Sequence, residues 1–515
     1  MEDNMQGRGI ASEEVIPDRV LLAEERIRQI CENCDDIIIR QMELGKDTRV
    51  KCLVVYIETA VSNMMLEDSV IGKLLNHLWE MGEKELREAV TENGLGISDV
   101  KELETMEECL AALLAGNAVF FMDGYDKALK IAGRGYPGMG VTKADSEKVL
   151  RGSREAFSES VKINTALIRK RIRTTKLKAE ELFLGERSNT LAVLLYMEEL
   201  AYPGLLEELK KRLDSIEIDG ILDSGVIEQL ASDTWYSPFP QFQTTERPDR
   251  AAAAVLEGRI VLLCDNTPMG LLLPTTMNSL LQTGDDYYGH FEIASLLRCI
   301  RWLAIVLAFS LPGLYLAVTN FHPQILPTNL LLSMADARGG VPFPAMGEVL
   351  LMEISFELMR EAGLRMPGPI GNMIGIVGGL IIGQAAVTAN LVSPIIVIID
   401  ALTALGSFSI PNEELSEAFR LLKYGMIFLC GFFGIYGYIA GWLLLLIHLA
   451  GLKSFGIPYL MPFAAADRDG ISRWTDGIFR APMRRLDHRP VYAKRENRRK
   501  MSLRHQEPSE LHEKE

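Results

Sequence analysis

The sequence predicts an α+β soluble N-terminal region of two related α/β subdomains, followed by an all-α multi-pass membrane domain. Two observations lead to this fold class. Charged residues are frequent up to about residue 300, but three later runs contain no Asp, Glu, Lys or Arg. These runs are residues 302–335, 366–399 and 424–452. Within the charged part, a strand pattern and a hairpin pattern each occur twice at nearly the same spacing.

The charge distribution divides the 515-residue chain into three parts. The net charge of −15 comes from an acidic N-terminal part, while the middle is nearly uncharged and the end is basic. This composition excludes a disordered or fibrous protein, and an acidic surface argues against nucleic-acid binding. We expect a polar segment (1–44), two cytosolic α/β subdomains (45–145 and 146–290), a transmembrane helical domain (291–452) and a basic cytoplasmic tail (453–515).

The first repeated feature is a buried strand followed by a helix. Residues 50–60 (VKCLVVYIETA) read as a buried strand, and a helix is expected over residues 66–79. Residues 190–201 (TLAVLLYMEELA) have the same pattern, with a helix over residues 204–213. Each subdomain is therefore expected to contain a small sheet with helices.

The second repeated feature is a β-hairpin. Residues 118–131 turn at Asp123-Gly124, a strong hairpin signal. Residues 260–273 turn at Asp265-Asn266 in the same way. The interval from strand to turn is nearly equal in the two cases, which indicates an internal repeat.

The soluble part contains no motif that indicates an enzyme. Residues 133–138 (GRGYPG) match GxGxxG, but Pro137 and Gly140 interrupt the helix that a dinucleotide loop needs, so we interpret them as a linker. Cys31 and Cys34 form a single CxxC without a second pair, which we interpret as incidental. We expect no catalytic residues, no cofactor and no metal site.

The uncharged runs predict membrane-spanning helices. About 20 apolar residues cross a hydrocarbon core of about 30 Å. We place spans at residues 302–319, 370–390, 394–410 and 425–449, with a partly re-entrant return at 325–335. Basic residues precede the first span (Arg298 and Arg301) and follow the last one, so the positive-inside rule places both ends in the cytoplasm and requires an even number of spans.

A stripe of glycines marks the second predicted span. Four glycines recur every fourth residue and share one helical face: Gly371, Gly375, Gly379 and Gly383. Small residues at this spacing let helix backbones approach closely in lipid. We interpret the stripe as a helix-packing surface within or between subunits.

Acidic residues in the apolar region are candidates for an ion path. Asp400 is the only charged residue between positions 366 and 412. It either faces the interior of a helix bundle or lies at a helix end near the interface. Glu348, Glu353 and Glu357 belong to a helix that either has a solvated acidic face or lines a cation-attracting vestibule. Our candidate ion path is Glu348, Glu353, Glu357 and Asp400.

Several strings resemble the GerA spore germination protein family, A subunit. They are VLRGSREAFSESVKINTALIRKRIR (149–173), ERPDRAAAAVLEGRIVLLCDNTP (246–268), GGVPFPAMGEVLLMEISFELMREAGLRMPGPIG (339–371), IIGQAAV (381–387), VSPIIVIIDALTALGSFSIPN (392–412) and SFGIPYLMPFA (454–464). The resemblance runs from about residue 45 to 465. The first 40 residues and those beyond about 470 lie outside it.

The resemblance implies a multi-pass subunit of a nutrient germinant receptor in the spore inner membrane or cell membrane, with its N- and C-terminal regions cytoplasmic. In that family the A subunit acts with a permease-like B subunit and a lipoprotein C subunit. It is thought to form a homo-oligomeric, nutrient-gated channel that releases monovalent cations and triggers germination. The implied partners are these subunits, membrane lipid and monovalent cations, and no nucleic acid.

Two alternatives remain open. Residues 136–157 also resemble the stage V sporulation paralogue that acts in dipicolinic-acid release, although the membrane half is more similar to the receptor A subunits. A secondary transporter is the other alternative. It should show inverted repeats in its membrane region, and no internal repeat is visible there.

Overall fold

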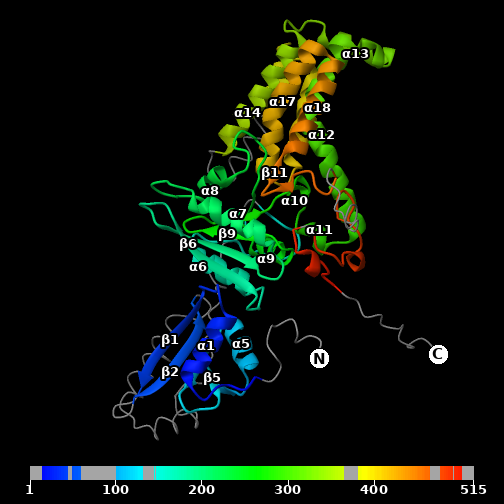
Figure 1. Ribbon diagram of the computed structural model, residues 1–515. Helices are drawn as coiled ribbons and strands as arrows, with labels where there is room; N and C mark the ends of the chain where they lie inside the picture. The colour runs from blue at the N-terminus through cyan, green and yellow to red at the C-terminus, as the bar shows by residue number, and fades with distance from the viewer. Residues whose placement is uncertain are drawn as a thin grey trace, which may run out of the picture. The chain divides into compact units, whose positions relative to one another are not determined.

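The computed structural model describes residues 14–44, 49–58, 100–131, 144, 147–364, 381–463, 476–490 and 492–501 (Figure 1). The chain forms two compact units. The N-terminal unit comprises Met1–Trp235, Gln241–Pro274 and Leu486–Glu515. The helical unit comprises Tyr236–Pro240 and Thr275–Arg485.

The N-terminal unit contains two five-stranded antiparallel sheets of identical topology. The first has the order β1-β2-β4-β5-β3, and the second has the order β6-β7-β9-β10-β8. The strands of the first sheet are β1 (Ile37–Leu44), β2 (Val50–Ile57), β3 (Val100–Leu103), β4 (Ala118–Met122) and β5 (Ala128–Ile131). Those of the second are β6 (Leu177–Leu184), β7 (Thr190–Met197), β8 (Gln243–Thr245), β9 (Ile260–Cys264) and β10 (Gly270–Leu273).

The registers of the two sheets also correspond. Ile37 lies opposite Ile57 in the first sheet, and Leu177 lies opposite Met197 in the second, about 140 residues later. Both predicted hairpins are present, as β4–β5 and β9–β10. The sequence repeat is therefore a structural repeat, and the two copies are called repeat 1 and repeat 2.

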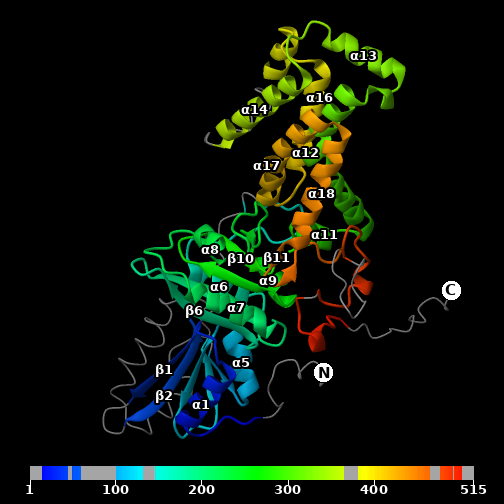
Figure 2. The ribbon, with the colours of Figure 1, turned by 45° about the horizontal axis from the view of Figure 1, so that its top comes forward.

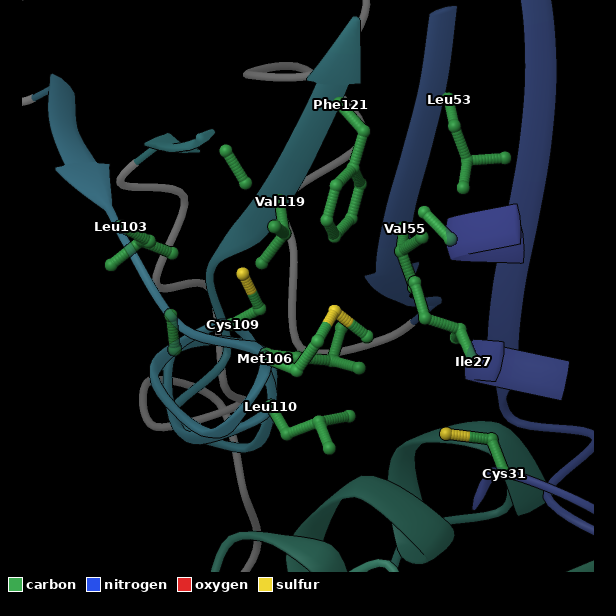
Figure 3. Close-up of a cluster of buried hydrophobic side chains, with 14 of the residues drawn as sticks. Ile27, Cys31, Leu53, Val55, Leu103, Met106, Cys109, Leu110, Val119 and Phe121 are labelled. Atoms are coloured by element: carbon green, nitrogen blue, oxygen red, sulfur yellow. The ribbon is translucent and has the colours of Figure 1, made fainter. Parts of the chain in front are cut away.

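Amphipathic helices cover one face of each sheet. In repeat 1, α1 (Val20–Ile30) and α5 (Met106–Leu114) bury side chains against β2 and β4. Figure 3 shows the side chain of Met106 directed toward Val55 and lying below Phe121 of the sheet. In repeat 2, α6 (Val161–Arg169) and α9 (Pro248–Leu256) have the same role. Burial of these apolar faces stabilises each sheet.

The hairpin aspartates cap the first helix of each repeat. Asp123 Oδ1 accepts a hydrogen bond of 3.1 Å from the backbone N–H of Val20. Asp265 Oδ1 accepts one of 3.0 Å from the backbone N–H of Val161. The first N–H groups of a helix have no partner within the helix, so the turn residue that forms each hairpin also fixes the start of a helix.

Repeat 1 begins earlier than the sequence indicated. Both α1 and β1 lie within residues 1–44, for which we had expected only a polar segment. The reason is that α1 is polar on its outer side, although Val20, Ala23 and Ile27 are buried. The helix expected over residues 66–79 lies outside the described residues. Helix α7 (Pro203–Asp214) coincides with the predicted helix 204–213 and is followed by α8 (Ser224–Ala231).

The helical unit is built around a long helix, α12 (Phe291–Phe321). This helix packs against α17 (Glu413–Phe433) and α18 (Ile435–Gly451). The three helices run side by side in Figures 1 and 2. Its other elements are α10 (Met277–Leu281), α11 (Asp285–Tyr288), η4 (Pro323–Ile325), α13 (Thr328–Arg338), α14 (Ala345–Leu364), α16 (Pro394–Phe408), β11 (Lys453–Ser454), β12 (Ile457–Pro458) and η5 (Met483–Arg485). Residues before α12 and after α18 share one core cluster, and the backbone N–H of Met277 donates to the carbonyl of Tyr459 at 2.9 Å. The chain therefore enters and leaves this unit at the same end.

The predicted span 425–449 is wrong as a single helix. Gly434, with φ +60°, separates α17 from α18, and α18 folds back along α17. A Cβ at Gly437 would lie 2.0 Å from the carbonyl oxygen of Leu429, and one at Gly441 would lie 2.7 Å from the sulfur of Met426. Composition did not indicate this reversal, because both helices continue the same uncharged run.

The other predicted spans correspond in part to observed helices. Residues 302–319 lie within α12, and residues 394–410 largely form α16. Of the span 370–390, only the part from residue 381 is described, and residues 381–388 are helical. The expected return at 325–335 is made of η4 and α13. Among the described residues, α12 is the one helix long and apolar enough to cross a membrane, and α16 and α18 are shorter apolar helices.

The end of the chain packs on repeat 2. Ala493 is buried and forms a β-bridge with Ala201, and the backbone N–H of Lys494 donates to the carbonyl of Leu200 at 2.9 Å. Gly258 has φ +91°, and a Cβ there would lie 2.8 Å from Ala493 Cα. This arrangement differs from the expected continuous tail from residue 453, since residues 453–463 belong to the helical unit instead. The 3₁₀ turn η6 (Arg495–Asn497) lies within the docked segment.

Candidate functional site

The acidic residues of α14 are directed at neighbouring helices. Glu348 is completely buried, and its carboxylate accepts a hydrogen bond of 2.8 Å from the backbone N–H of Ser393, the N-cap of α16. The guanidinium of Arg338, at the end of α13, lies 3.2 Å from the same carboxylate. A carboxylate at a helix N-terminus is stabilised by the helix dipole. Glu348 thus joins α13, α14 and α16.

Glu353 forms a buried ion pair with Lys423 of α17. Each side chain is only 5% exposed, and the Lys423 ammonium donates directly to Glu353 Oε2. The other oxygen, Glu353 Oε1, has no hydrogen-bond partner among the described residues. Because removing charges from water is costly, a pair buried this deeply is kept only when each charge has its partner.

Asp400 of α16 completes the same site. Its residue surface is 2% exposed, and its carboxylate interacts electrostatically with both Glu353 and Lys423. Within the described part of the chain, neither Asp400 oxygen has a hydrogen-bond partner. Glu353, Asp400 and Lys423 come from three helices, α14, α16 and α17, whose arrangement Figure 2 shows. We call them the three-helix charge cluster.

Glu357 lies one turn further along α14 and is more exposed. Its carboxylate is 3.1 Å from the guanidinium of Arg420, which also contacts Glu417 at 3.2 Å. Arg360 and Glu413 are 3.5 Å apart near the same helix ends. The charged side chains therefore extend from the buried Glu353–Lys423 pair to a partly exposed group at the start of α17.

The depth of burial differs among the acidic residues. A solvated face is excluded for Glu348 and Glu353, because both are buried, whereas Glu357 remains partly solvated. Asp400 lies in the middle of α16 and not at a helix end. The sequence interpretation missed their basic partners, Arg338, Arg420 and Lys423. The spacing of Arg420 and Lys423, three residues apart directly before the uncharged half of α17, was the available signal.

The glycine stripe is described at one of its four positions. Gly371, Gly375 and Gly379 lie outside the described residues. At Gly383, an added Cβ would lie 3.2 Å from a methyl group of Val397, so this glycine packs closely on α16. The contact is within the subunit.

A second charge cluster lies where the chain enters and leaves the helical unit. Asp286 is 1% exposed and is paired with Arg298 at 3.1 Å and with Arg301 at 2.7 Å. Arg298 also binds Asp476, after the last helix, at 2.7 Å. Burial opposes ionisation of Asp286, but the hydrogen bonds from Arg301 and the nearby charge of Arg298 outweigh burial and lower its pKa below the ordinary value. The two basic residues used to predict orientation are thus already neutralised.

In the N-terminal unit, a buried ion pair joins the repeats. Arg169, at the end of α6, donates from Nε and Nη2 to Asp36 at 2.8 and 2.6 Å. Cys34 forms a parallel β-bridge with Ala179 beside this pair. Burial raises the pKa of the Cys31 thiol to about 12, so the CxxC carries protonated thiols at neutral pH. A redox or metal role is not supported by these positions.

The GxGxxG match at residues 133–138 lies outside the described residues. No group of three or more His, Cys, Asp or Glu suited to a metal ion occurs within the part of the chain that the structure describes.

Known proteins resemble this chain over most of its length. Residues 25–492 match the family described as Bacillus/Clostridium GerA spore germination protein. "Uncharacterized membrane protein YfkQ" of Bacillus subtilis (strain 168) is 41% identical over 92% of this chain and 91% of its own length. "Spore germination protein KA" of the same organism is 37% identical over 90% of this chain and 84% of its own.

A third relative and one solved structure complete the comparison. "Spore germination protein A1" of Bacillus subtilis (strain 168) is 40% identical over 75% of this chain and 80% of its own. The crystal structure of the N-terminal domain of the A subunit of the Bacillus megaterium spore germinant receptor GerK3 is 28% identical, with a TM-score of 0.41, over 51% of this chain and 98% of that one.

The family match is wider than the quoted strings indicated. It begins at residue 25 and ends at residue 492, so it includes the second half of α1 and all of β1, and it ends directly before Ala493, which packs on repeat 2. The expected limits of about 45 and 465 were too narrow because the strings used to set them were short and contiguous. The chain belongs to the GerA family of spore germination proteins, the family of germinant receptor A subunits.

Proposed function

We propose that this chain is the A subunit of a nutrient germinant receptor, and that its helical unit spans the membrane several times and contributes to a cation path. The observation that carries the proposal is the family match over residues 25–492, which covers both units. In this proposal the chain is not an enzyme, and its repeats bind no cofactor.

The surface of the helical unit supports membrane insertion. Large apolar side chains are exposed on four helices, including Leu303 of α12, Leu405 of α16, Phe432 of α17, and Leu444 and Ile447 of α18. Soluble monomers rarely expose apolar patches larger than a few hundred Å², whereas lipid stabilises such a surface. Helix α12 has 31 residues, about 46 Å at 1.5 Å per residue, which exceeds the hydrocarbon thickness of about 30 Å.

The path of the chain supports an even number of crossings. Met277 before α12 and Tyr459 after α18 are hydrogen-bonded to each other, so entry and exit lie at one end of the helical unit. We propose that both ends of the chain lie in the cytoplasm. The break at Gly434 makes α17 and α18 two separate passes, which raises the four expected spans to five, so we propose that one further segment of the helical unit also crosses the membrane.

The candidate ion path remains Glu348, Glu353, Glu357 and Asp400. The first three are paired with Arg338, Lys423 and Arg420, respectively. A cation that moves along this face must therefore compete with basic side chains of the same subunit. We propose that opening of these pairs accompanies conduction in a homo-oligomer that acts with permease-like and lipoprotein subunits.

A deletion of the gene tests the receptor assignment. Spores without the chain should lose their response to at least one nutrient, and the wild-type gene should restore it. The tagged chain should co-purify with a permease-like protein and a lipoprotein. Deletion spores that respond normally to a nutrient panel but release dipicolinic acid slowly would contradict the receptor assignment and favour the stage V paralogue.

A further inference from the structure

The three-helix charge cluster leaves one carboxylate without its own counter-charge. Glu353 and Asp400 together carry two negative charges when ionised, and Lys423 supplies one positive charge. Lys423 is committed to Glu353 by a direct hydrogen bond. Asp400, 2% exposed, lacks a hydrogen-bond partner among the described residues at both oxygens.

An isolated buried carboxylate is costly, because a low-dielectric environment does not solvate its charge. Three buried carboxylate oxygens of this cluster accept no hydrogen bond within the described residues: both of Asp400 and Glu353 Oε1. Oxygen ligands suit hard cations. The formal charge of −1 that remains after pairing with Lys423 matches a single monovalent cation.

We propose that Asp400 and Glu353 form a binding site for one alkali-metal cation, of the Na⁺ or K⁺ class, beside the ammonium of Lys423. This proposal rests on the proposed function, because insertion into the membrane gives these helices their apolar surroundings. Lys423 sets the stoichiometry, since in the closed ion pair it neutralises one of the two carboxylates. The bound cation holds α14, α16 and α17 together, and its departure leaves repelling charges that favour their separation.

Thermal unfolding of the full-length protein in detergent tests the site without requiring conduction. The midpoint Tm is followed at constant ionic strength while KCl or NaCl replaces choline chloride, whose cation is too large for the site. Stabilisation by a ligand grows with the logarithm of its concentration above Kd. We expect wild-type Tm to rise by about 2 °C or more for each tenfold increase of the small cation.

Charge-changing variants separate the site from general salt effects. Asp400→Asn removes the uncompensated charge and should abolish the difference between K⁺ and choline. The double variant Glu353→Gln/Lys423→Gln retains one uncompensated carboxylate and should keep a cation response. Lys423→Gln alone leaves two uncompensated carboxylates and should increase the cation response. Asp336→Asn is the matched control, because it makes the same substitution at an exposed carboxylate of α13 in the same unit, and it should respond like wild type.

Three results would overturn the proposal. An equal Tm in K⁺ and in choline would show that the salt effect reflects ionic strength and not a bound cation. A Tm that does not change with the K⁺ concentration but falls as the pH rises would mean that Asp400 carries a proton instead of a cation. A cation response that survives in Asp400→Asn would place the site elsewhere. A cation-specific Tm shift in a protein that conducts no ions would leave the site intact and refute only the channel.

Discussion

At the scale of single residues, the chain uses buried charge pairs to join segments that are distant in sequence. Arg169 is fully buried and donates to Asp36 and to the backbone carbonyls of Thr174 and Leu177. Burial alone would lower the pKa of Arg169, but the adjacent carboxylate of Asp36 raises it, so the pair is ionised. The charge is thereby satisfied on all sides at the contact between the two repeats.

Substitution of one member of this pair should strongly destabilise the N-terminal unit. Arg169→Met leaves the buried carboxylate of Asp36 unpaired, and we expect a loss of about 3–5 kcal/mol in the free energy of unfolding. Urea unfolding, monitored by circular dichroism, measures this loss in the free energy of unfolding. Lys162→Met is the matched control, because Lys162 and Glu58 form a more exposed pair between the same repeats, and it should cost about 1 kcal/mol or less. Similar losses in the two variants would refute this explanation.

Asp286 makes a second residue-scale prediction, on pH dependence. Its pKa in the folded protein lies below the ordinary value of 3.8, so its ionised form stabilises the folded state. This contribution is fully present above about pH 4 to 5 and is lost as the pH falls through the lower folded pKa. In acid titrations of Tm, Asp286→Asn should be less stable than wild type at neutral pH, and the two curves should converge toward pH 2. Parallel curves over that range would contradict the pairing.

At the scale of elements, sequence patterns predicted β2, β7 and both hairpins, but they missed β1, β3, β6 and β8 and the helix reversal. Hairpins were predictable because Asp123-Gly124 and Asp265-Asn266 both occupy left-handed turns, with φ of +75° at Gly124 and +64° at Asn266. The break between α17 and α18 was not predictable from hydropathy. Four glycines occur between residues 431 and 441, and only the structure distinguishes Gly434 by its backbone conformation.

Gly434 is accordingly the element-scale test. Gly434→Ala places a Cβ within 2.8–3.1 Å of Phe321 in a conformation that favours glycine, with φ +60° and ψ −134°. We expect a loss of about 2 kcal/mol or more in the stability of the helical unit. Gly425→Ala is the control, since no atom lies within 4 Å of its Cβ, and an alanine should be neutral or stabilise α17 by up to about 1 kcal/mol. Thermal unfolding in detergent measures both; an unchanged Tm in Gly434→Ala would refute the tight reversal.

The candidate site shows the same limit of sequence reasoning. The spacing of Glu353 and Glu357 predicts which side chains share a face of α14, but it does not state what packs against that face. Lys423 lies 70 residues away from Glu353 and meets it only after α16 and α17 have packed. The acidic half of the site was therefore predictable from local periodicity, whereas its basic half depends on long-range packing.

At the scale of the whole molecule, the positions of the chain ends and of α12 predict the membrane topology. If both ends are cytoplasmic and α12 crosses the membrane once, α13 lies on the opposite side. In intact cells that produce the chain, a membrane-impermeant maleimide should label Ser333→Cys in α13 but not Ser215→Cys in the N-terminal unit. Both positions are exposed, and each variant is compared with the parent chain, whose described cysteines are buried except for the partly buried Cys299. Labelling of Ser215→Cys alone would invert the orientation.

The central claim is that the helical unit carries cations through residues of the acidic face. The most direct measurement is the conductance of planar bilayers that contain the purified receptor, recorded with nutrient present. We expect a cation-selective conductance that is strongly reduced in the variant Glu353→Gln/Glu357→Gln/Asp400→Asn. Neutralisation of two exposed acids of α7, by Glu207→Gln/Asp214→Asn, should leave it unchanged. Absence of a cation conductance, or an equal conductance and selectivity in the triple variant, would contradict the account.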